Sequence, residues 1–205
     1  MHFPTAGVEG MVSSTPIIMP RVRISEMIES SSASEAKWLR QCSKPADPVL
    51  ALFGAGHVGR AIVDVLKSLP IQVIWVDSRA DEYPLETPRN VRQVVIDSPV
   101  DAVPTVPAGA LYLVMTHNHA TDFALCTKIL SRGDAVYCGM IGSDSKRYQC
   151  EKRLRAAGLS EGVVRQLSCP IGIPGIEGKQ PSEIAVSVVA ELLLTLSQSA
   201  ASQRQ

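Results

Sequence analysis

The glycine-rich motif Gly54-Ala55-Gly56-His57-Val58-Gly59 constrains the fold of this chain more than any other feature of the sequence. It follows the apolar segment 48–53, which has the length and composition of a buried strand. It opens residues 57–68, whose apolar side chains recur with a helical period. In such a unit the first glycine permits a tight turn, the second lets the backbone approach a pyrophosphate, and the third lets the helix pack on the strand. The motif therefore predicts a nucleotide-binding α/β fold.

A carboxylate stands where a nucleotide-binding fold needs one. Asp77 ends the next strand segment, residues 71–76, at about the spacing expected of a ribose-binding acid. It would favour NAD over NADP because a carboxylate repels a 2′-phosphate, whereas Arg79 could accommodate that phosphate. His57 could reach a phosphate at the helix N-terminus or simply be solvated. The alternative for the whole motif is that its glycines serve only helix–strand packing.

Strands and helices are expected to alternate along the rest of the chain. Further strands are expected at 91–96, 111–115 and 135–141, and helices at 120–131, 145–157, 160–167 and from 181 to about 196. The proline-rich stretch 99–107 is expected to lack regular structure. This order predicts parallel βαβ units in a doubly wound Rossmann-like sheet with helices on both faces. Residues 1–47 are expected to form an arm or linker, with a short helix around 35–41, residues 48–197 the Rossmann-like domain, and residues 198–205 a tail.

Charge and cysteine content restrict the partners and the compartment. The chain has 20 Lys and Arg and 20 Asp and Glu, so no long-range field attracts it to nucleic acid or an acidic membrane. Five cysteines without a CxxC pair suit a reducing cytoplasm, and Cys126 and Cys138 fall in apolar stretches typical of a core. No signal peptide is apparent, and the longest apolar stretch, 184–196, contains Glu191 and is too short to span a bilayer. We expect a cytoplasmic protein with no nucleic-acid or membrane partner, and a homodimer that covers the apolar segment 184–196.

Polar residues follow the segment 111–115, at the carboxyl end where ligands bind in doubly wound folds. Thr116, His117, His119 and Asp122 could contact a polar ligand, transfer protons or bind a metal. Metal binding is the least favoured of these, because the two histidines point to opposite sides of an extended chain. The alternative for Asp122 is a role at the N-terminus of the following helix.

A second candidate anion site follows the segment 135–141. Gly142, Ser143 and Lys146 combine small residues with a cation at a helix start. The alternative is a tight turn followed by a solvated basic face. Cys169 lies in a Gly/Pro loop, where we expect a potentially reachable thiol that could touch a soft ligand.

Six segments of the chain carry a resemblance to a known family. They are FGAGHVGRA, WVDSR, VMTHNHATD, GMIGSDSKR, CPIG and PSEIAVSVVAEL, in this order across residues 48–197. Each is unremarkable alone, but the ordered set resembles the C-terminal Rossmann domain of the xanthine dehydrogenase accessory family (XdhC/CoxI type). The resemblance implies a chaperone, not an enzyme, that binds molybdenum cofactor as molybdopterin or its dinucleotide form. It also implies support of the cofactor's sulfuration, with a cysteine desulfurase as a candidate partner, and its insertion into xanthine dehydrogenase or another molybdenum hydroxylase.

This resemblance suggests a role for each candidate residue. The glycines Gly54, Gly56 and Gly59 would hold a phosphate and Asp77 a ribose hydroxyl. The pterin or metal end would meet His117, His119, Asp122 and Cys169, and a further anion would meet Ser143 and Lys146.

Two features depart from the family pattern. Residues 1–47 are too short to supply the N-terminal domain that members typically carry. The loop after Cys169 lacks the aspartate and threonine usual before Pro181, and Gln180 is a poorer N-cap than threonine. The alternative function is a NAD(P)-dependent oxidoreductase, although neither a substrate domain nor a catalytic Tyr/Lys pair is apparent. A third reading is an interaction module that has lost its ligand.

Overall fold

The computed structural model describes residues 22–23, 47–176 and 178–202. The strands are β1 (Val22–Arg23), β2 (Val49–Phe53), β3 (Gln72–Asp77), β4 (Val91–Val95), β5 (Leu111–Val114), β6 (Tyr137–Met140) and β7 (Leu167–Ser168). The helices are α3 (His57–Leu66), α4 (His119–Arg132), α5 (Asp144–Ala156), α6 (Glu161–Val164) and α7 (Pro181–Ser202), and two 3-10 helices are η1 (Ala80–Glu82) and η2 (Pro99–Thr105).

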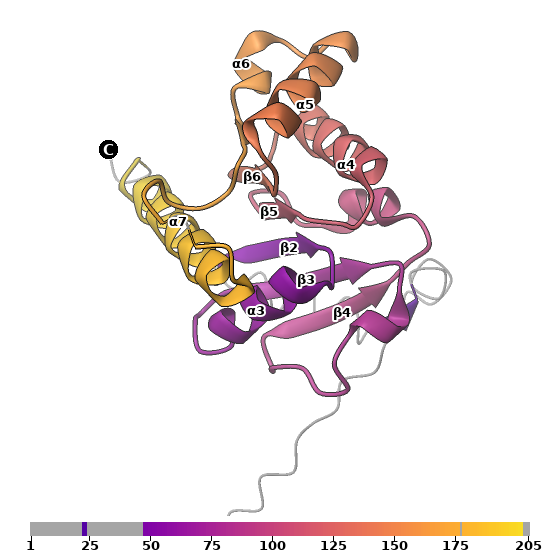
Figure 1. The fold of residues 1–205 in the computed structure, drawn as a ribbon, viewed down its shortest axis with the longest axis vertical. Coiled ribbons are helices and arrows are strands. Elements are labelled where there is room, and N and C mark those ends of the chain that lie inside the picture. The colour runs from indigo at the N-terminus through magenta and orange to yellow at the C-terminus, as the bar shows by residue number, and fades with distance from the viewer. Residues whose placement is uncertain (1–21, 24–46, 177, 203–205) are drawn as a thin grey trace, which may run out of the picture.

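These strands form one seven-stranded sheet in the order β1-β4-β3-β2-β5-β6-β7, and every neighbouring pair is parallel (Figure 1). The direction in which strands are added reverses between β2 and β5, which defines the switch point of a doubly wound sheet. The predicted Rossmann-like fold class is therefore confirmed.

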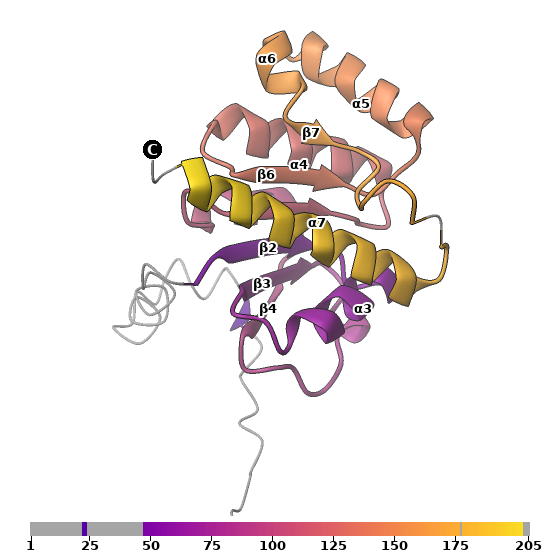
Figure 2. The same cartoon turned by 90° about the vertical axis from the view of Figure 1, so that its left-hand side faces the viewer.

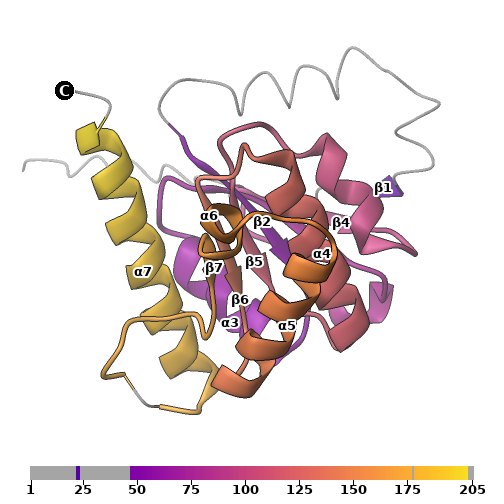
Figure 3. The ribbon, with the colours of Figure 1, turned by 90° about the horizontal axis from the view of Figure 1, so that it is seen from above.

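Helices cover both faces of the sheet. Seen from above, α3 and α7 lie on one side and α4 and α5 on the other (Figure 3), and Figure 2 shows α7 lying over its face of the sheet. Because successive side chains of a strand point to opposite faces, β2 contributes Leu52 to the core under α3 and α7 and Phe53 to the core under α4. All five residues of β2 are buried, as expected of a central parallel strand.

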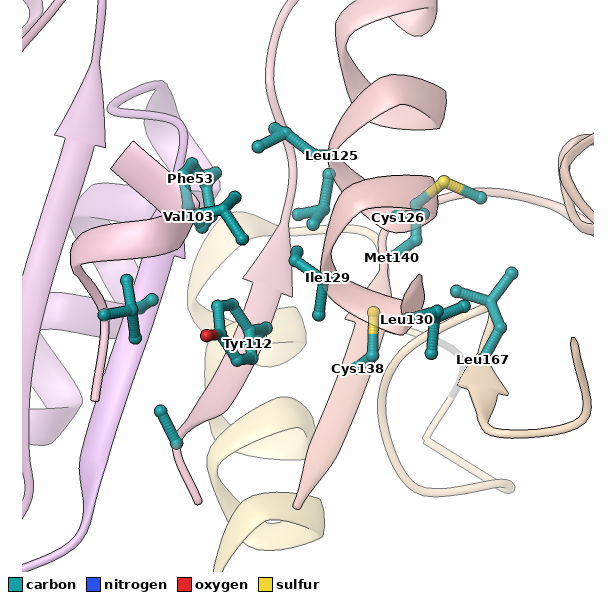
Figure 4. Close-up of a cluster of buried hydrophobic side chains, with 14 of the residues drawn as sticks. Phe53, Val103, Tyr112, Leu125, Cys126, Ile129, Leu130, Cys138, Met140 and Leu167 are labelled. Atoms are coloured by element: carbon teal, nitrogen blue, oxygen red, sulfur yellow. The ribbon is translucent and has the colours of Figure 1, made fainter. Parts of the chain in front are cut away.

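The core under α4 contains the buried cysteines predicted from the sequence. Cys126 and Cys138 pack there with Tyr112, Ile129 and other apolar side chains (Figure 4). Cys150 and Cys169 also belong to this core, and all four are free thiols.

Two helix starts are fixed by short polar side chains. The Asn118 side chain accepts hydrogen bonds from the backbone N–H groups of Ala120 and Thr121 and so caps α4. The Ser143 side chain accepts from Lys146 N and caps α5. Asn118 is thus the cap, and Asp122, for which a role at this N-terminus was the alternative, is the acidic residue in the first turn of α4.

Two local predictions are also wrong. The stretch 99–107 contains η2, because Pro99 occupies its first turn, where a missing N–H costs nothing, and a short 3-10 helix tolerates Pro104 near its end. The expected helix at 160–167 ends at Val164, because Leu167 pairs with Cys138 as part of β7. Strand β1 was not predicted, and the helix expected around 35–41 lies outside the described residues.

Helix α7 is longer than the sequence pattern predicts. Its 22 residues continue to Ser202, and Pro181–Ala201 is long and apolar enough to cross a bilayer by length and composition alone, whereas the predicted apolar segment 184–196 is only part of it. In the structure, however, Ala185, Val188 and Leu192 are buried against the core shared with α3. Three apolar side chains of α7 remain exposed, Val186, Leu193 and Leu194. The homodimer expected to cover this helix stays a prediction.

Two buried tyrosines allow a matched test of the core. The hydroxyl of Tyr112 has no hydrogen-bond partner within the described part of the chain, and burial raises the pKa of Tyr112 to about 12. The hydroxyl of Tyr83 is hydrogen-bonded to the carbonyl oxygens of Trp75 and Val94, both at 2.9 Å. We expect Tyr112→Phe to leave the free energy of unfolding unchanged or raise it by about 1 kcal/mol, and Tyr83→Phe to lower it by about the same amount. Urea unfolding measures both, and a larger loss for Tyr112→Phe than for Tyr83→Phe would contradict the prediction.

Candidate functional site

The glycine loop joins β2 to α3, and its three glycines are required for different reasons. Gly54 has a φ of 122°, and a Cβ there would collide with the carbonyl oxygen of Met115. A Cβ at Gly59 would collide with the carbonyl oxygen of Gly54. Close packing therefore explains glycine at these two positions. This agrees, for Gly54 and Gly59, with the alternative that the glycines serve only helix–strand packing.

Gly56 has no such explanation. Its φ of −69° suits any residue, and a Cβ built on it would meet nothing within 4 Å. Neither backbone conformation nor packing thus calls for glycine at this position. Glycine would be needed here if the space above the loop had to stay open, because a side chain at this position would obstruct a ligand that approaches the backbone.

The N-terminus of α3 presents donors to that open space. The first N–H groups of a helix lack partners within the helix. Gly56 occupies the N-cap position without a side-chain cap, and the first turn carries no acidic residue. His57 is the first helical residue and is exposed. Unpaired amides and a positive dipole end suit an anion.

The predicted ribose acceptor, Asp77, is buried, with a side-chain exposure of 3%. Its Oδ2 accepts from Ala55 N at 2.7 Å and Arg79 Nη2 at 3.0 Å, and its Oδ1 accepts from Arg79 N and Nε, both at 3.0 Å. Burial by itself would raise the pKa of Asp77, but the hydrogen bonds from Arg79 and Ala55 outweigh it and hold the pKa below the usual value. Since a carboxylate offers about four acceptor positions, a ribose hydroxyl could bind Asp77 only by displacing Arg79.

Arg79 is itself part of a chain of charges beside the glycine loop. Its Nη1 contacts Glu82 Oε1 at 2.9 Å, and Arg60 Nη2 contacts Glu82 Oε2 at 2.7 Å. Arg60 Nε also donates to the carbonyl oxygens of Ala55 and Glu82. With 34% of its side chain exposed, Arg79 has room to turn toward an arriving ligand.

A cleft of about 220 Å³, here called the polar cleft, opens at the carboxyl ends of β3, β4 and β5. Its lining residues are Asp77, Ser78, Asp97, Pro99, Thr116, His117, Asn118 and Thr121. Asp77, Thr116 and His117 were predicted as site residues from the sequence, and the fold brings them together. Asp97 was missed, although it follows the strand at 91–96 and the same rule about carboxyl ends would have found it.

Asp122 and Lys146, both predicted to contact ligand, contact each other instead. The Nζ of Lys146 lies 2.7 Å from Asp122 Oδ2 and donates to the carbonyl oxygen of Ile141 at 2.9 Å. Asp122 is fully buried and also accepts from the N–H and hydroxyl of Thr116, at 2.9 and 2.7 Å. The pair therefore ties the loop after β5 to the loop after β6. A ligand role for either residue would require this pair to open.

The other basic residues of α5 form the solvated face given above as the alternative. Arg147 pairs with Glu151 at 2.8 Å, and Arg155 pairs with Glu161 at 2.6 Å. Arg153 lies over the ring of Phe123, 4.3 Å from its centroid. These three arginines thus have partners within the domain.

The remaining predicted residues lie apart from the polar cleft. His119 is the exposed first residue of α4 and does not line that cleft. Ser143 is the cap of α5, and Gly142 lines a second cleft beside α7. Across residues 22–23, 47–176 and 178–202, no group of three or more His, Cys, Asp or Glu side chains could hold a metal ion.

Cys169 is not the reachable thiol that the sequence suggested. Its side chain is 2% exposed and packs in the core under α4, and its Sγ lies 3.2 Å from where a Cβ of Gly142 would be. Burial raises the pKa of Cys169 to about 11, although Lys146 nearby acts in the opposite direction. The prediction of an accessible thiol is wrong, because this part of the loop turns inward after β7.

Comparisons with known proteins agree with the resemblance seen in the sequence. The family model described as the XdhC Rossmann domain matches residues 50–192. The uncharacterized protein YqeB of Escherichia coli (strain K12) is 29% identical over 147 residues, which cover 71% of this chain and 27% of YqeB. A second similar protein is from Bacillus halodurans, and its crystal structure is described as that of a xanthine dehydrogenase. The two structures superpose with a TM-score of 0.62 at 21% sequence identity, and the match covers 82% of this chain and 52% of the Bacillus halodurans chain. The chain thus spans about a quarter of the first relative and about half of the second, and the structural likeness shows a shared fold.

Because Asp122 and Lys146 form a buried ion pair, we expect the protein to lose much of its stability when one partner is removed. Lys146→Ala would leave the fully buried carboxylate of Asp122 without its cation. We expect the free energy of unfolding to fall by about 3 to 5 kcal/mol, measured by urea denaturation. Lys128→Ala, at an exposed position of α4, is the matched control and should change it by no more than about 0.5 kcal/mol. A loss below about 1 kcal/mol for Lys146→Ala would contradict the prediction, because the carboxylate of Asp122 would then not depend on this cation.

The buried thiols predict slow chemical modification. In a Cys42→Ser background, which removes the one cysteine outside the described residues, Cys126, Cys138, Cys150 and Cys169 remain. With a pKa of about 11, Cys169 is a thiolate to roughly one part in a thousand at pH 8, and its reactivity should rise as the pH approaches that pKa. We expect a disulfide reagent at pH 8 to titrate all four thiols only in denaturant. Rapid labelling of one thiol in the native protein, located by mass spectrometry at Cys169, would disprove its burial.

Proposed function

The chain belongs to the XdhC Rossmann domain family, and on that basis we propose that it is an accessory protein of xanthine dehydrogenase or a related molybdenum hydroxylase. In this role it binds molybdenum cofactor, by the phosphate or nucleotide tail, and passes it to the recipient enzyme. We propose a cytoplasmic location, which suits the four free cysteine thiols of the domain.

The observation that carries this proposal is the open space over Gly56. A Cβ at this position would meet nothing within 4 Å, and the amides at the start of α3 have no capping side chain. A glycine needed only for packing would be surrounded by neighbours, as Gly54 and Gly59 are. The loop therefore fits a phosphate that approaches the backbone.

The polar cleft suits the rest of a nucleotide tail. Asp77 would accept a ribose hydroxyl once Arg79 turns away, and the freed guanidinium could then pair with a phosphate. His117, which lines the same cleft, offers further hydrogen bonds to polar groups of the ligand, whereas both donors of Thr116 are bound to Asp122. The bound cofactor would supply molybdenum chemistry only in the recipient enzyme, so here these residues bind and orient it.

Sulfuration of the cofactor would need a sulfur donor. Within the described residues the cysteines are buried, and burial raises the pKa of Cys169, so none offers an exposed thiolate. We therefore propose that sulfur comes from a partner protein, a cysteine desulfurase, while the cofactor is held on this domain.

Thermal unfolding with and without ligand tests the proposal. Molybdenum cofactor, released anaerobically, at about a hundred times its dissociation constant should add roughly 2.7 kcal/mol of stability and raise the melting temperature by a few degrees. Gly56→Val should abolish this shift because the side chain would fill the space over the loop. Gly162→Val is the matched control, since Gly162 also has no heavy atom closer than 4.0 Å to an added Cβ and lies on α6.

The outcomes separate the candidate functions. A shift with the cofactor that Gly56→Val removes and Gly162→Val keeps supports the carrier function. A shift with NAD or NADP alone would replace it with a nicotinamide-dependent oxidoreductase, and turnover would then appear as a change in nicotinamide absorbance. The absence of a shift with all three ligands would refute nucleotide binding by the glycine loop.

A further inference from the structure

A second cleft, of about 160 Å³, opens on the α7 side of the sheet, beyond the ends of β6 and β7. We call it the isoleucine cleft, because Ile141, Ile171, Ile176 and Ile184 line it. Three of these pack against the core shared by α3 and α7, whereas Ile176 is 46% exposed at the mouth. Among the lining residues, Ser187 has the only polar side chain.

The wall of this cleft is held in place by hydrogen bonds from α7. Glu191 accepts from Ser168 Oγ at 2.8 Å and from Gly172 N at 2.6 Å. Ser187 Oγ accepts from Ile173 N at 2.8 Å. Gly172 has a φ of 106°, and a Cβ there would lie 2.6 Å from Ser187 Oγ, so the loop can approach α7 this closely only with glycine. The cleft is therefore preformed, which lowers the cost of binding.

Among the residues that the structure describes, those lining the isoleucine cleft carry no charged side chain. The stem of Lys146 lies near the lining residue Gly142, 2.7 Å from where a Cβ of that glycine would be. Its ammonium, however, is bound to Asp122 and to the carbonyl oxygen of Ile141. The described lining therefore offers a ligand aliphatic contacts and one hydroxyl group, which favours an uncharged group.

We propose that the isoleucine cleft binds an uncharged six-membered aromatic or heteroaromatic ring that carries a hydrogen-bonding substituent. Aliphatic cavities of about 150 Å³ hold a benzene-sized ring, which matches the volume of about 160 Å³. The Ser187 oxygen already accepts a hydrogen bond, and its proton remains available to donate to a carbonyl on the ring. This binding is independent of the phosphate at the glycine loop, which belongs to a different set of residues.

The test is a titration of the protein with 4-fluorobenzamide, a single uncharged ring with an amide, followed by fluorine NMR. We expect saturable binding at millimolar concentrations. Ile176→Glu should weaken it roughly tenfold or more, because a carboxylate at the mouth would have to lose water. Ile184→Phe should abolish it by filling the cleft. Val186→Glu is the matched control: this residue is exposed on the same helix but does not line the cleft, and binding should be unchanged.

Circular dichroism melts confirm that each variant is folded, and Gly56→Val should bind the ring as the parent does, which separates this site from the proposed cofactor site. The proposal is overturned if the parent shows no saturable binding. It is equally overturned if Ile176→Glu and Ile184→Phe, both folded, bind the ring as tightly as Val186→Glu.

Discussion

The hydrogen bond from Ala55 N to Asp77 fixes the glycine loop to the end of β3, and much of the domain follows from it. Trp75 reinforces the attachment by donating its indole N–H to the carbonyl oxygen of Gly54 at 2.9 Å. With the loop placed, α3 lies against the sheet and shares a core with α7. Helix α7 in turn holds the loop after β7 through Glu191. Asp77, which holds the glycine loop, also lines the polar cleft, and helix α7 lines the isoleucine cleft through Ile184 and Ser187.

Two buried carboxylates stand at the ligand-binding edge, and each is neutralised from within the domain. Arg79 compensates Asp77, and Lys146 compensates Asp122. Without these partners, the two acids would repel an anionic ligand. Internal pairing lets the edge keep acceptors for hydroxyl groups and still admit a phosphate. In the proposed function, a ribose would replace Arg79 as a partner of Asp77, and such an exchange favours moderate affinity and release.

The local part of this fold could be predicted from the sequence, and the long-range part could not. The strand before the glycine loop, α3 and Asp77 were predicted because pattern and spacing within some 25 residues determine them. The contact of Lys146 with Asp122 joins residues 24 positions apart on different helices, and no periodic signal encodes it. The sequence predicted an accessible Cys169 because Gly/Pro loops are usually exposed. In the structure its side chain instead packs in the core under α4. The two-residue strand β7 was too short for any pattern, since only its pairing with β6 defines it.

The outer strands of the sheet have a consequence for solubility. Strands β1 and β7 flank the sheet described above, and each is only two residues long. A long, flat edge exposes a row of backbone donors and acceptors on which strands of other chains can assemble, whereas a two-residue edge provides almost no template. Within the described residues, the two outermost strands therefore provide almost no template for strand-by-strand aggregation. Contacts with other proteins are left to side-chain surfaces, whose specificity can be selected residue by residue.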